Sequence, residues 1–220
     1  MVAAKSLVAA TLFALVFPVS ALADSPTVRI KKADQATAVA ALLHQSDFGA
    51  GWRGGPTTPS KLTAPSCPGF NPKESDLVVN GHAEAKFALQ QSGVEFDQDV
   101  QVLVNAAAVQ KDFARAIRPQ LAACIAYTIK KAKNVIDAQV VKFPFPPAGT
   151  VRAAYRAKIV IRGSNGQGRF LKEIDFVFFG EGRLEFEFTV SAPVGASDQL
   201  VRFESGMAEI LLKRTGAAAA

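Results

Sequence analysis

Four basic side chains in the segment 151–162 have the spacing of a single row. They are Arg152, Arg156, Lys158 and Arg162. Because residues two apart on a β-strand project from the same face, a strand here would present all four cations on one side and an apolar surface on the other. Such a row of cations has the chemistry to bind an anionic ligand.

Carboxylates occur at the same spacing in the two segments that follow: Glu173 with Asp175, and Glu185 with Glu187. Opposite charges that face each other across antiparallel strands stabilise a sheet by some tenths of a kcal/mol per pair. A charge ladder on a solvated face therefore accounts for the whole group, and anion binding remains mainly for Arg152 and Arg162, at the strand ends. Paired carboxylates also serve as the acid and base of glycosidases, but this spacing alone gives no sign of a raised pKa.

The other candidates for chemistry form no catalytic motif. His44 and His82 are the two histidines, one at a helix end and one on the polar face of a strand; we expect both at the surface and neither as a metal ligand. The chain has no Gly-x-Ser-x-Gly elbow, no Gly-x-Gly-x-x-Gly fingerprint and no phosphate loop. We therefore expect neither enzymatic activity nor a cofactor.

Trp52 is the single tryptophan and lies in the glycine-rich stretch Gly51-Trp52-Arg53-Gly54-Gly55. If exposed, its ring would be a stacking surface for a ligand; otherwise it folds down over the edge of the core, which is the more frequent role of such a residue. The candidate ligand contacts are Trp52, Arg152, Tyr155 and Arg156, facing a cleft between a long loop and the sheet.

The elements that must position these residues begin with an antiparallel meander over 150–192. Its three strands alternate apolar and polar residues, with turns at Ser164-Asn165-Gly166 and Gly180-Glu181-Gly182. The Phe residues 176, 178, 179, 186 and 188 are expected in the core.

The remaining segments complete the order α-β-β-α-β-β-β-β-α, which predicts an α+β fold with an antiparallel sheet of about six strands packed with helices. The expected elements are a helix over 33–45 capped by Asp34, strands over 77–87 and 100–104, a helix after the cap Asn105 that Pro119 kinks or splits, a strand over 135–141 and a helix over 197–213 capped by Ser197 or Asp198. The stretch from Asp47 to Asn71 has no hydrophobic period and is expected to be a long loop.

The N-terminus has the pattern of a signal peptide. Lys5 precedes the uncharged run 7–16, and Ala21-Leu22-Ala23 provides a cleavage site before Asp24. We expect residues 1–23 to be removed, a single domain over 24–216 and a short tail over 217–220, with no membrane span in the mature chain. The net charge of +6 favours anionic partners, and export makes nucleic acid an unsuitable one.

Cys67 and Cys124 are the two cysteines, and an exported protein meets an oxidising compartment. The even number of cysteines and the oxidising compartment favour one disulfide bridge between them. In the chain-entropy account, a bridge that closes so long a loop stabilises the folded state by roughly 4 kcal/mol. Two buried free thiols are the alternative, and a catalytic thiol is a third.

Several short motifs resemble the PknH-type extracellular sensor domain, which occurs on membrane serine/threonine kinases and as exported proteins on its own. They are Gly51-Trp52, Cys67-Pro68-Gly69-Phe70, Arg118-Pro119-x-Leu121-x-x-Cys124, Tyr155-Arg156 and Gly182-Arg183. The resemblance implies an antiparallel sheet with helices, a Cys67 to Cys124 bridge and a cleft for an unidentified ligand. It supplies no catalytic residues, and without a kinase domain, a membrane span or a second bridge it does not imply signalling across a membrane.

Together these features predict an exported, non-enzymatic, sensor-like ligand-binding protein of the cell envelope, expected to be a monomer. Its partner would be a small molecule, a lipid or an envelope polymer. The alternative is a structural or interaction module whose basic face meets an anionic polymer or a partner protein; binding that collapses with added salt would favour this alternative.

Overall fold

The computed structural model describes residues 24–90, 92–163, 168–195 and 197–216. The expected signal peptide 1–23, the turn 164–166 and the tail 217–220 lie outside the described residues. The described strands form one eight-stranded sheet in the order β1-β3-β4-β8-β7-β6-β5, with β2 also paired to β3. The strands are β1 (Thr27–Val28), β2 (Trp52–Thr57), β3 (Val78–Leu89), β4 (Val94–Leu103), β5 (Val135–Lys142), β6 (Val151–Arg162), β7 (Arg169–Glu181) and β8 (Leu184–Pro193).

The α+β class and the antiparallel sheet are as predicted, and the described sheet has more strands than the six expected. Apart from the short parallel pair β1 and β3, all the strand pairs of the sheet are antiparallel. The two unexpected strands, β1 and β2, lie at opposite ends of the same edge of β3. β2 contains Gly54, Gly55 and Pro56, whose composition favours a loop, and an edge strand tolerates that composition because its outer side forms no ladder.

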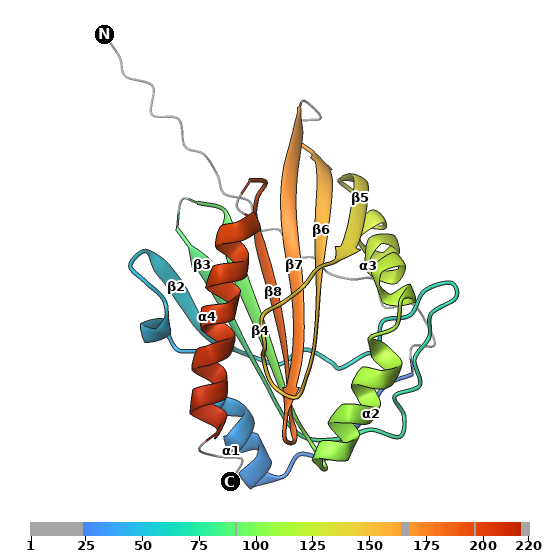
Figure 1. The fold of residues 1–220 in the computed structure, drawn as a ribbon, viewed down its shortest axis with the longest axis vertical. Coiled ribbons are helices and arrows are strands. Elements are labelled where there is room, and N and C mark those ends of the chain that lie inside the picture. The colour runs from blue at the N-terminus through green and yellow to red at the C-terminus, as the bar shows by residue number, and fades with distance from the viewer. Residues whose placement is uncertain (1–23, 91, 164–167, 196, 217–220) are drawn as a thin grey trace.

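Helices cover both faces of the sheet (Figure 1). On one side, which we call the α1/α4 face, α1 (Lys32–Ala40) and α4 (Ser197–Gly216) pack over the apolar side chains of β3, β4 and β8. On the other, the α2/α3 face, α2 (Ala106–Ala116) and α3 (Gln120–Lys130) pack over β4 to β8 together with the segment 58–77. The core therefore has two layers, one on each face of the sheet.

The first helix is shorter than predicted. It ends at Ala40 instead of Gln45, and the 3₁₀ turn Gln45–Asp47 follows it. Asp34 does not cap it; its carboxylate forms an ion pair with Arg183 at 2.7 Å. Leu42 and Leu43 are buried as expected, but outside the helix, and Val39 is 48% exposed.

The long helix predicted after Asn105 is split at Pro119, one of the two outcomes expected there. The Asn105 side chain accepts a hydrogen bond from the Ala108 amide at 2.9 Å and caps α2, and Pro119 directly precedes α3. The pair α2 and α3 carries the chain from β4, inside the sheet, to β5 at its edge. This crossover places both helices over the α2/α3 face.

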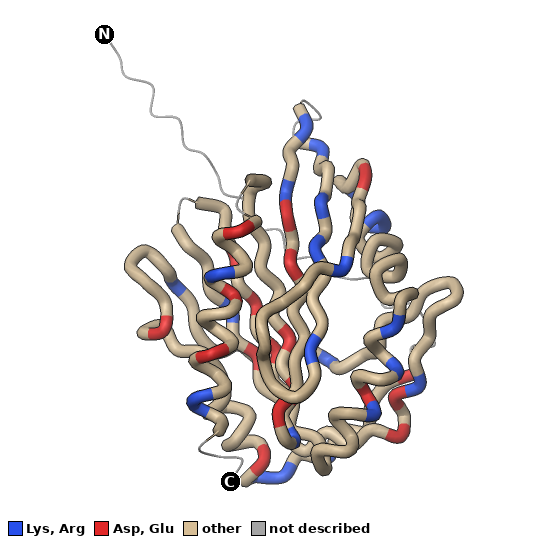
Figure 2. Tube along the Cα trace, viewed as in Figure 1, with Lys and Arg blue, Asp and Glu red and all other residues tan. Residues whose placement is uncertain are grey.

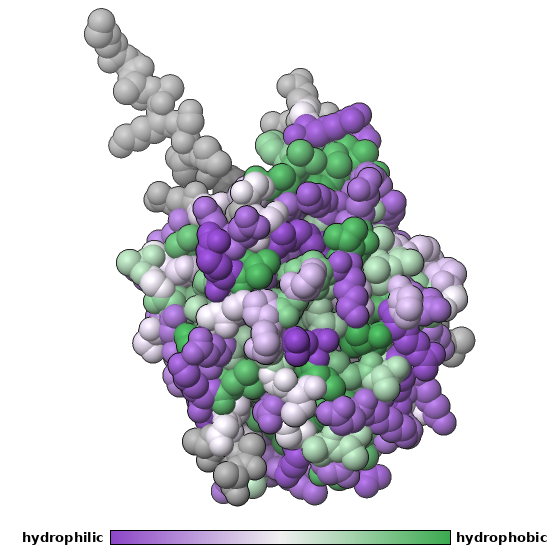
Figure 3. Space-filling model, viewed as in Figure 1, coloured by the Kyte–Doolittle hydropathy of each residue, from purple (hydrophilic) through white to green (hydrophobic). Residues whose placement is uncertain are grey.

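The meander over β6, β7 and β8 is confirmed, with Gly182 in the left-handed conformation (φ 56°) at the second turn. The β6–β7 hairpin extends beyond its neighbours (Figure 1). Apolar surface gathers near its end (Figure 3), where Phe170 and Leu171 are about 60% exposed. Among the described helices, none is long and apolar enough to cross a bilayer.

Candidate functional site

A cavity of about 390 Å³ lies under the α2/α3 face, between the sheet and the elements that cover it. We call it the α2/α3 cavity. Its volume is at the lower end of the range for small-molecule sites. Its apolar walls come from the segment 58–77, which we call the covering segment, from α2 and α3 with the residues that join them, and from β7: Leu62, Phe113, Ile117, Leu121, Ile125, Phe176 and Phe178.

Carboxylates of three adjacent strands lie side by side on this face of the sheet, and those of Asp99 and Glu187 line the cavity. The sheet register pairs Glu84 of β3 with Asp99 of β4, and Asp99 with Glu187 of β8. Figure 2 shows the acidic positions gathered in this part of the sheet. Like charges directly opposite one another destabilise a sheet, so this row requires compensation from protons or cations.

His82 provides part of that compensation. Its Nε2 lies 2.6 Å from Asp99 Oδ2 and 3.7 Å from Glu84 Oε1. Burial lowers the pKa of His82, but the hydrogen bond to Asp99 and the charges of both carboxylates outweigh burial, and the net pKa is raised. In its protonated form His82 therefore compensates one of the two negative charges at the β3 and β4 end of the row.

The expectation that His82 lies at the surface is wrong, because its side chain is buried between the two strands. The ligand atoms of His82, Glu84 and Asp99 lie within 4.8 Å of one another, a donor set that suits a divalent metal ion. In the described geometry these atoms are already bonded, His82 to Asp99 and Glu84 to the hydroxyl and amide of Ser60. His44 is exposed, as expected.

Glu185 and Glu187, at the β8 end, have no such compensation. Neither carboxylate forms a hydrogen bond or an ion pair with any residue that the structure describes, and Glu185 Oε1 is fully buried. Burial raises the pKa of Glu187 to about 8, with the charge of Asp99 as the next cause. Burial likewise raises the pKa of Glu185 well above its usual range.

A third uncompensated carboxylate enters the cavity from the covering segment. Glu74 is only 9% exposed, and its carboxylate forms no hydrogen bond or ion pair within the described ranges. Burial and the charge of Asp112 raise the pKa of Glu74 to about 8. The nearby Arg115 donates to Asp112 at 3.0 Å and to Asp76, its buried Nη2 has no hydrogen-bond partner among the described residues, and its charge lowers the pKa of Glu74 less than burial raises it.

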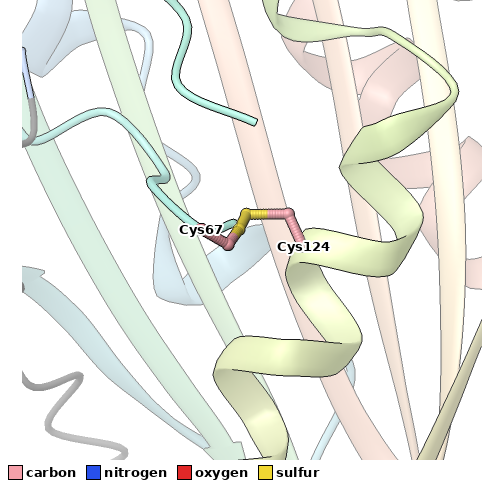
Figure 4. The surroundings of a disulfide bond; sticks show 2 residues. All are labelled: Cys67 and Cys124. Carbon is pink, nitrogen blue, oxygen red and sulfur yellow. A yellow bond between two sulfur atoms is a disulfide. The ribbon is translucent and has the colours of Figure 1, made fainter. Parts of the chain in front are cut away.

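A disulfide joins the covering segment to α3. Cys67 and Cys124 are bonded, with their Cα atoms 5.6 Å apart (Figure 4), which confirms the expected bridge and excludes both free-thiol alternatives. Cys124 is among the residues that line the cavity. The bridge therefore fixes one wall of the cavity to another.

The four predicted ligand contacts do not line the α2/α3 cavity, and the structure does not bring them together. Trp52 is 7% exposed and packs on Phe48 and Phe203, with ring centroids 4.9 and 5.3 Å away, so it covers the core on the α1/α4 face. Tyr155 is buried on the opposite face, where burial raises its pKa. Arg152 donates to the Phe145 carbonyl at 3.2 Å beside a shallow depression.

Arg156 belongs to the charge ladder that was the alternative to anion binding. Its guanidinium donates to both oxygens of Asp175, its partner in the register, and Lys158 lies opposite Glu173 with a 3.9 Å separation. The face is not solvated as expected, because Glu173 and Asp175 are buried. The ladder therefore stabilises the α1/α4 face from within.

Glu185 and Glu187 do not belong to this ladder, contrary to the prediction. The two-residue turn after β7 pairs Glu181 with Leu184 and Asp175 with Val190, which places the β8 carboxylates on the α2/α3 face. Counting the register outward from that turn would have found this from the sequence. Glu84 lies two residues after His82, and this spacing could have indicated from the sequence that the two side chains share a face. Glu74 lies in an irregular segment, where the sequence pattern gives no indication of which side chains come together.

A scan against protein-family models returns no match for the chain, and a search of curated proteins finds none either.

Proposed function

We propose that this chain is an exported, non-enzymatic protein that binds a small molecule in the α2/α3 cavity. The observation that carries the proposal is the cavity itself: about 390 Å³ with apolar walls and three carboxylates that lack partners among the described residues. Natural ligand sites combine these features, an apolar enclosure with a few convergent polar groups.

Export and the sensor-like role are parts of the same proposal. The signal-peptide pattern at the N-terminus and the disulfide favour an oxidising compartment. The motifs shared with PknH-type sensor domains favour ligand recognition as the role. Compared with the alternative of an anion-binding module, the cavity has support from geometry, since Arg156 of the basic row is engaged with Asp175.

The experiment combines native mass spectrometry of the protein from its own host with binding of a neutral probe, decan-1-ol, to recombinant protein. Ala116 lines the cavity at the end of α2, so Ala116→Trp fills it, whereas Ala114→Trp places the same ring on the exposed side of α2 as a matched control. We expect a stoichiometric small molecule on the host protein, and decan-1-ol binding that is lost in Ala116→Trp and kept in Ala114→Trp. The proposal would be wrong if the protein from its host carried no ligand and if Ala116→Trp and Ala114→Trp bound decan-1-ol equally well.

A further inference from the structure

The carboxylates of the α2/α3 cavity come from opposite walls and converge on its interior. Glu185 and Glu187 project from β8, and Glu74 from the covering segment. All three line the cavity, and none has a hydrogen-bonded or ion-paired partner among the residues described. An anionic ligand would meet three carboxylates here, and desolvating like charges together is unfavourable.

No cation among the described residues forms a hydrogen bond or an ion pair with these carboxylates, although the charge of Arg115 lowers the pKa of Glu74 and Glu185 against the larger effect of burial. His82 is bonded to Asp99, and Arg115 to Asp76 and Asp112. Lys131, at the rim, lies over the ring of Tyr127, 4.3 Å from its centroid. The net charge of the whole chain is +6, yet the ionisable groups that line the cavity are mostly acidic.

The rest of the lining is apolar, which separates this site from a simple ion site. Phe113 of α2, Ile117 directly after it, and Leu121 and Ile125 of α3 line the helical side of the cavity, and Phe176 and Phe178 line it from the sheet. A bare metal ion would leave that wall without a function. A ligand with an apolar body and a cationic head would use both parts of the lining.

We propose that the α2/α3 cavity binds an organic cation, an amine or quaternary ammonium group attached to an apolar body, with Glu185, Glu187 and Glu74 around the head and the helical wall around the body. This inference rests on the proposed function and specifies its ligand class. The cation replaces the protons that the buried carboxylates otherwise retain, so binding strengthens as those protons leave.

The pH dependence depends on every charged group that faces these carboxylates. These are Asp24 before β1, Asp112 and Arg115 on α2, Asp97 and Asp99 on β4, His82 and Glu84 on β3, and Lys131 after α3. Most of them are acidic; His82 and Arg115 are held in ion pairs, and Lys131 lies over the Tyr127 ring. Between pH 6 and pH 9 the cavity therefore becomes more negative, and affinity for a cation of fixed charge rises, while affinity for a neutral probe stays constant.

The test compares three probes with one apolar body and different heads: decyltrimethylammonium, decan-1-ol and decane-1-sulfonate. Isothermal titration calorimetry below micellar concentrations gives their affinities for the full exported chain at pH 6 and pH 9. We expect the cation to bind at least about tenfold more tightly than the alcohol at pH 9, because its charge is attracted to carboxylates that have lost their protons, and the sulfonate to bind weakest.

The variant Glu185→Gln/Glu187→Gln removes the β8 charges at constant shape. It should lower the affinity for decyltrimethylammonium by about tenfold or more and leave the affinity for decan-1-ol unchanged. Glu209→Gln, on the exposed side of α4, should change neither affinity. Circular dichroism at pH 6 checks that the double variant is folded. If it is not, the single variant Glu74→Gln makes the same comparison from the opposite wall.

The outcomes separate the ligand class from the site itself. If the alcohol or the sulfonate binds as tightly as the cation, the proposal that the ligand is cationic is wrong. The proposal that the cavity is a ligand-binding site would still hold. Displacement of the cation by micromolar Zn²⁺ or Ca²⁺, with the Gln variants losing metal affinity, would overturn the proposal of an organic cation in favour of a metal centre. If none of the probes bound and Ala116→Trp behaved as the unmodified protein, the proposed function would fail and this inference with it.

Discussion

Arg156 makes the best-defined ion pair of the basic row, and its partners decide what the row does. Its guanidinium donates to Asp175 Oδ1 at 2.7 Å, to Asp175 Oδ2, and to the Ser197 carbonyl at 3.1 Å. Asp175 is completely buried, and a buried carboxylate that loses its cation destabilises the fold. The guanidinium of Arg156 is therefore engaged in bonds within the protein and is not free to bind an anionic ligand.

We therefore expect Arg156→Met to lower the free energy of unfolding by about 3 kcal/mol, because it leaves Asp175 uncompensated. Lys158→Met is the matched control, since Lys158 is 62% exposed and 3.9 Å from its partner, and should cost less than about 1 kcal/mol. Urea unfolding monitored by circular dichroism measures both. The double variant Arg156→Met/Asp175→Leu should recover most of the loss; an Arg156→Met protein as stable as the unmodified one would reopen the anion-binding interpretation.

At the scale of the element, α4 packs on the sheet through its apolar side chains and buries an acidic residue with them. Glu204 lies on the buried side of α4, and neither of its carboxylate oxygens has a hydrogen-bond partner in the part of the chain that the structure describes. Burial, followed by the charge of Asp175, raises the pKa of Glu204 to about 9. The helix therefore docks with Glu204 protonated, so that Arg156 has to neutralise only Asp175 at this point.

The sign of the resulting pH effect follows from the raised pKa. The unfolded chain releases the Glu204 proton near pH 4.5 and the folded chain only near pH 9, so the stability contributed by this group falls as pH rises through that window. We expect Glu204→Gln, which does not titrate, to match the unmodified protein at pH 5 and to be more stable by a few kcal/mol at pH 9. Thermal unfolding at the two pH values is the measurement, and identical pH profiles for both proteins would contradict the shift.

The covering segment depends on its disulfide. Residues 58–77 contain β-bridge partners Cys67 and Phe70 but no strand or helix, so the Cys67–Cys124 bond is the covalent link that holds this segment on α3. We expect Cys67→Ser/Cys124→Ser to lower the free energy of unfolding by about 4 kcal/mol in the chain-entropy account. Hydrogen exchange should show the largest loss of protection in 58–77 and in α3, with β6 to β8 little changed; uniform loss across the sheet would indicate that the bond acts on the whole fold.

At the scale of the whole molecule, alternation and helical spacing predict most of the fold. The meander, α2 and α3 on either side of Pro119, and α4 are all present near their expected bounds, because each has a periodic apolar face to bury. The missed strand β2 has no such period and exists because it completes the edge of β3. Tertiary pairing, which local sequence does not encode, decides elements of that kind.

The candidate site was harder to predict from the sequence than the fold was. Within one strand, alternation shows which residues share a face, but it does not show which face of the next strand is continuous with it. The turn at Gly182 and Arg183 decides that question for Glu185 and Glu187, and it moves them from the charge ladder to the cavity. Glu74 joins them only through the path of an irregular segment, which depends on the disulfide.

The carboxyl groups with raised pKa values all make the folded chain less stable as pH rises. Burial raises the pKa of Glu74 and Glu187 to about 8 and of Glu204 to about 9, so each contributes stability that is lost as pH rises above 4.5. His82, whose pKa is raised chiefly by Asp99 against the opposing effect of burial, contributes stability that is complete below pH 6.5 and lost above its folded pKa. Carboxylates with lowered pKa oppose them only in acid: Asp24, Asp47, Asp76, Asp137 and Glu209.

The two sets together place the stability maximum near pH 4.5, where the lowered carboxyls are ionised and the raised ones still hold their protons, and we expect the melting temperature to fall steadily from there to pH 9. An organic cation in the α2/α3 cavity would compensate Glu74 and Glu187 but not Glu204, which lies on the other face. A saturating amount of decyltrimethylammonium should therefore raise the melting temperature more at pH 9 than at pH 6, and reduce the fall without abolishing it. The remaining slope should become smaller when Glu204→Gln is added, with the contribution of His82 left. A melting temperature that rises from pH 6 to pH 9 would contradict the protonated state of these buried carboxyls in the folded protein.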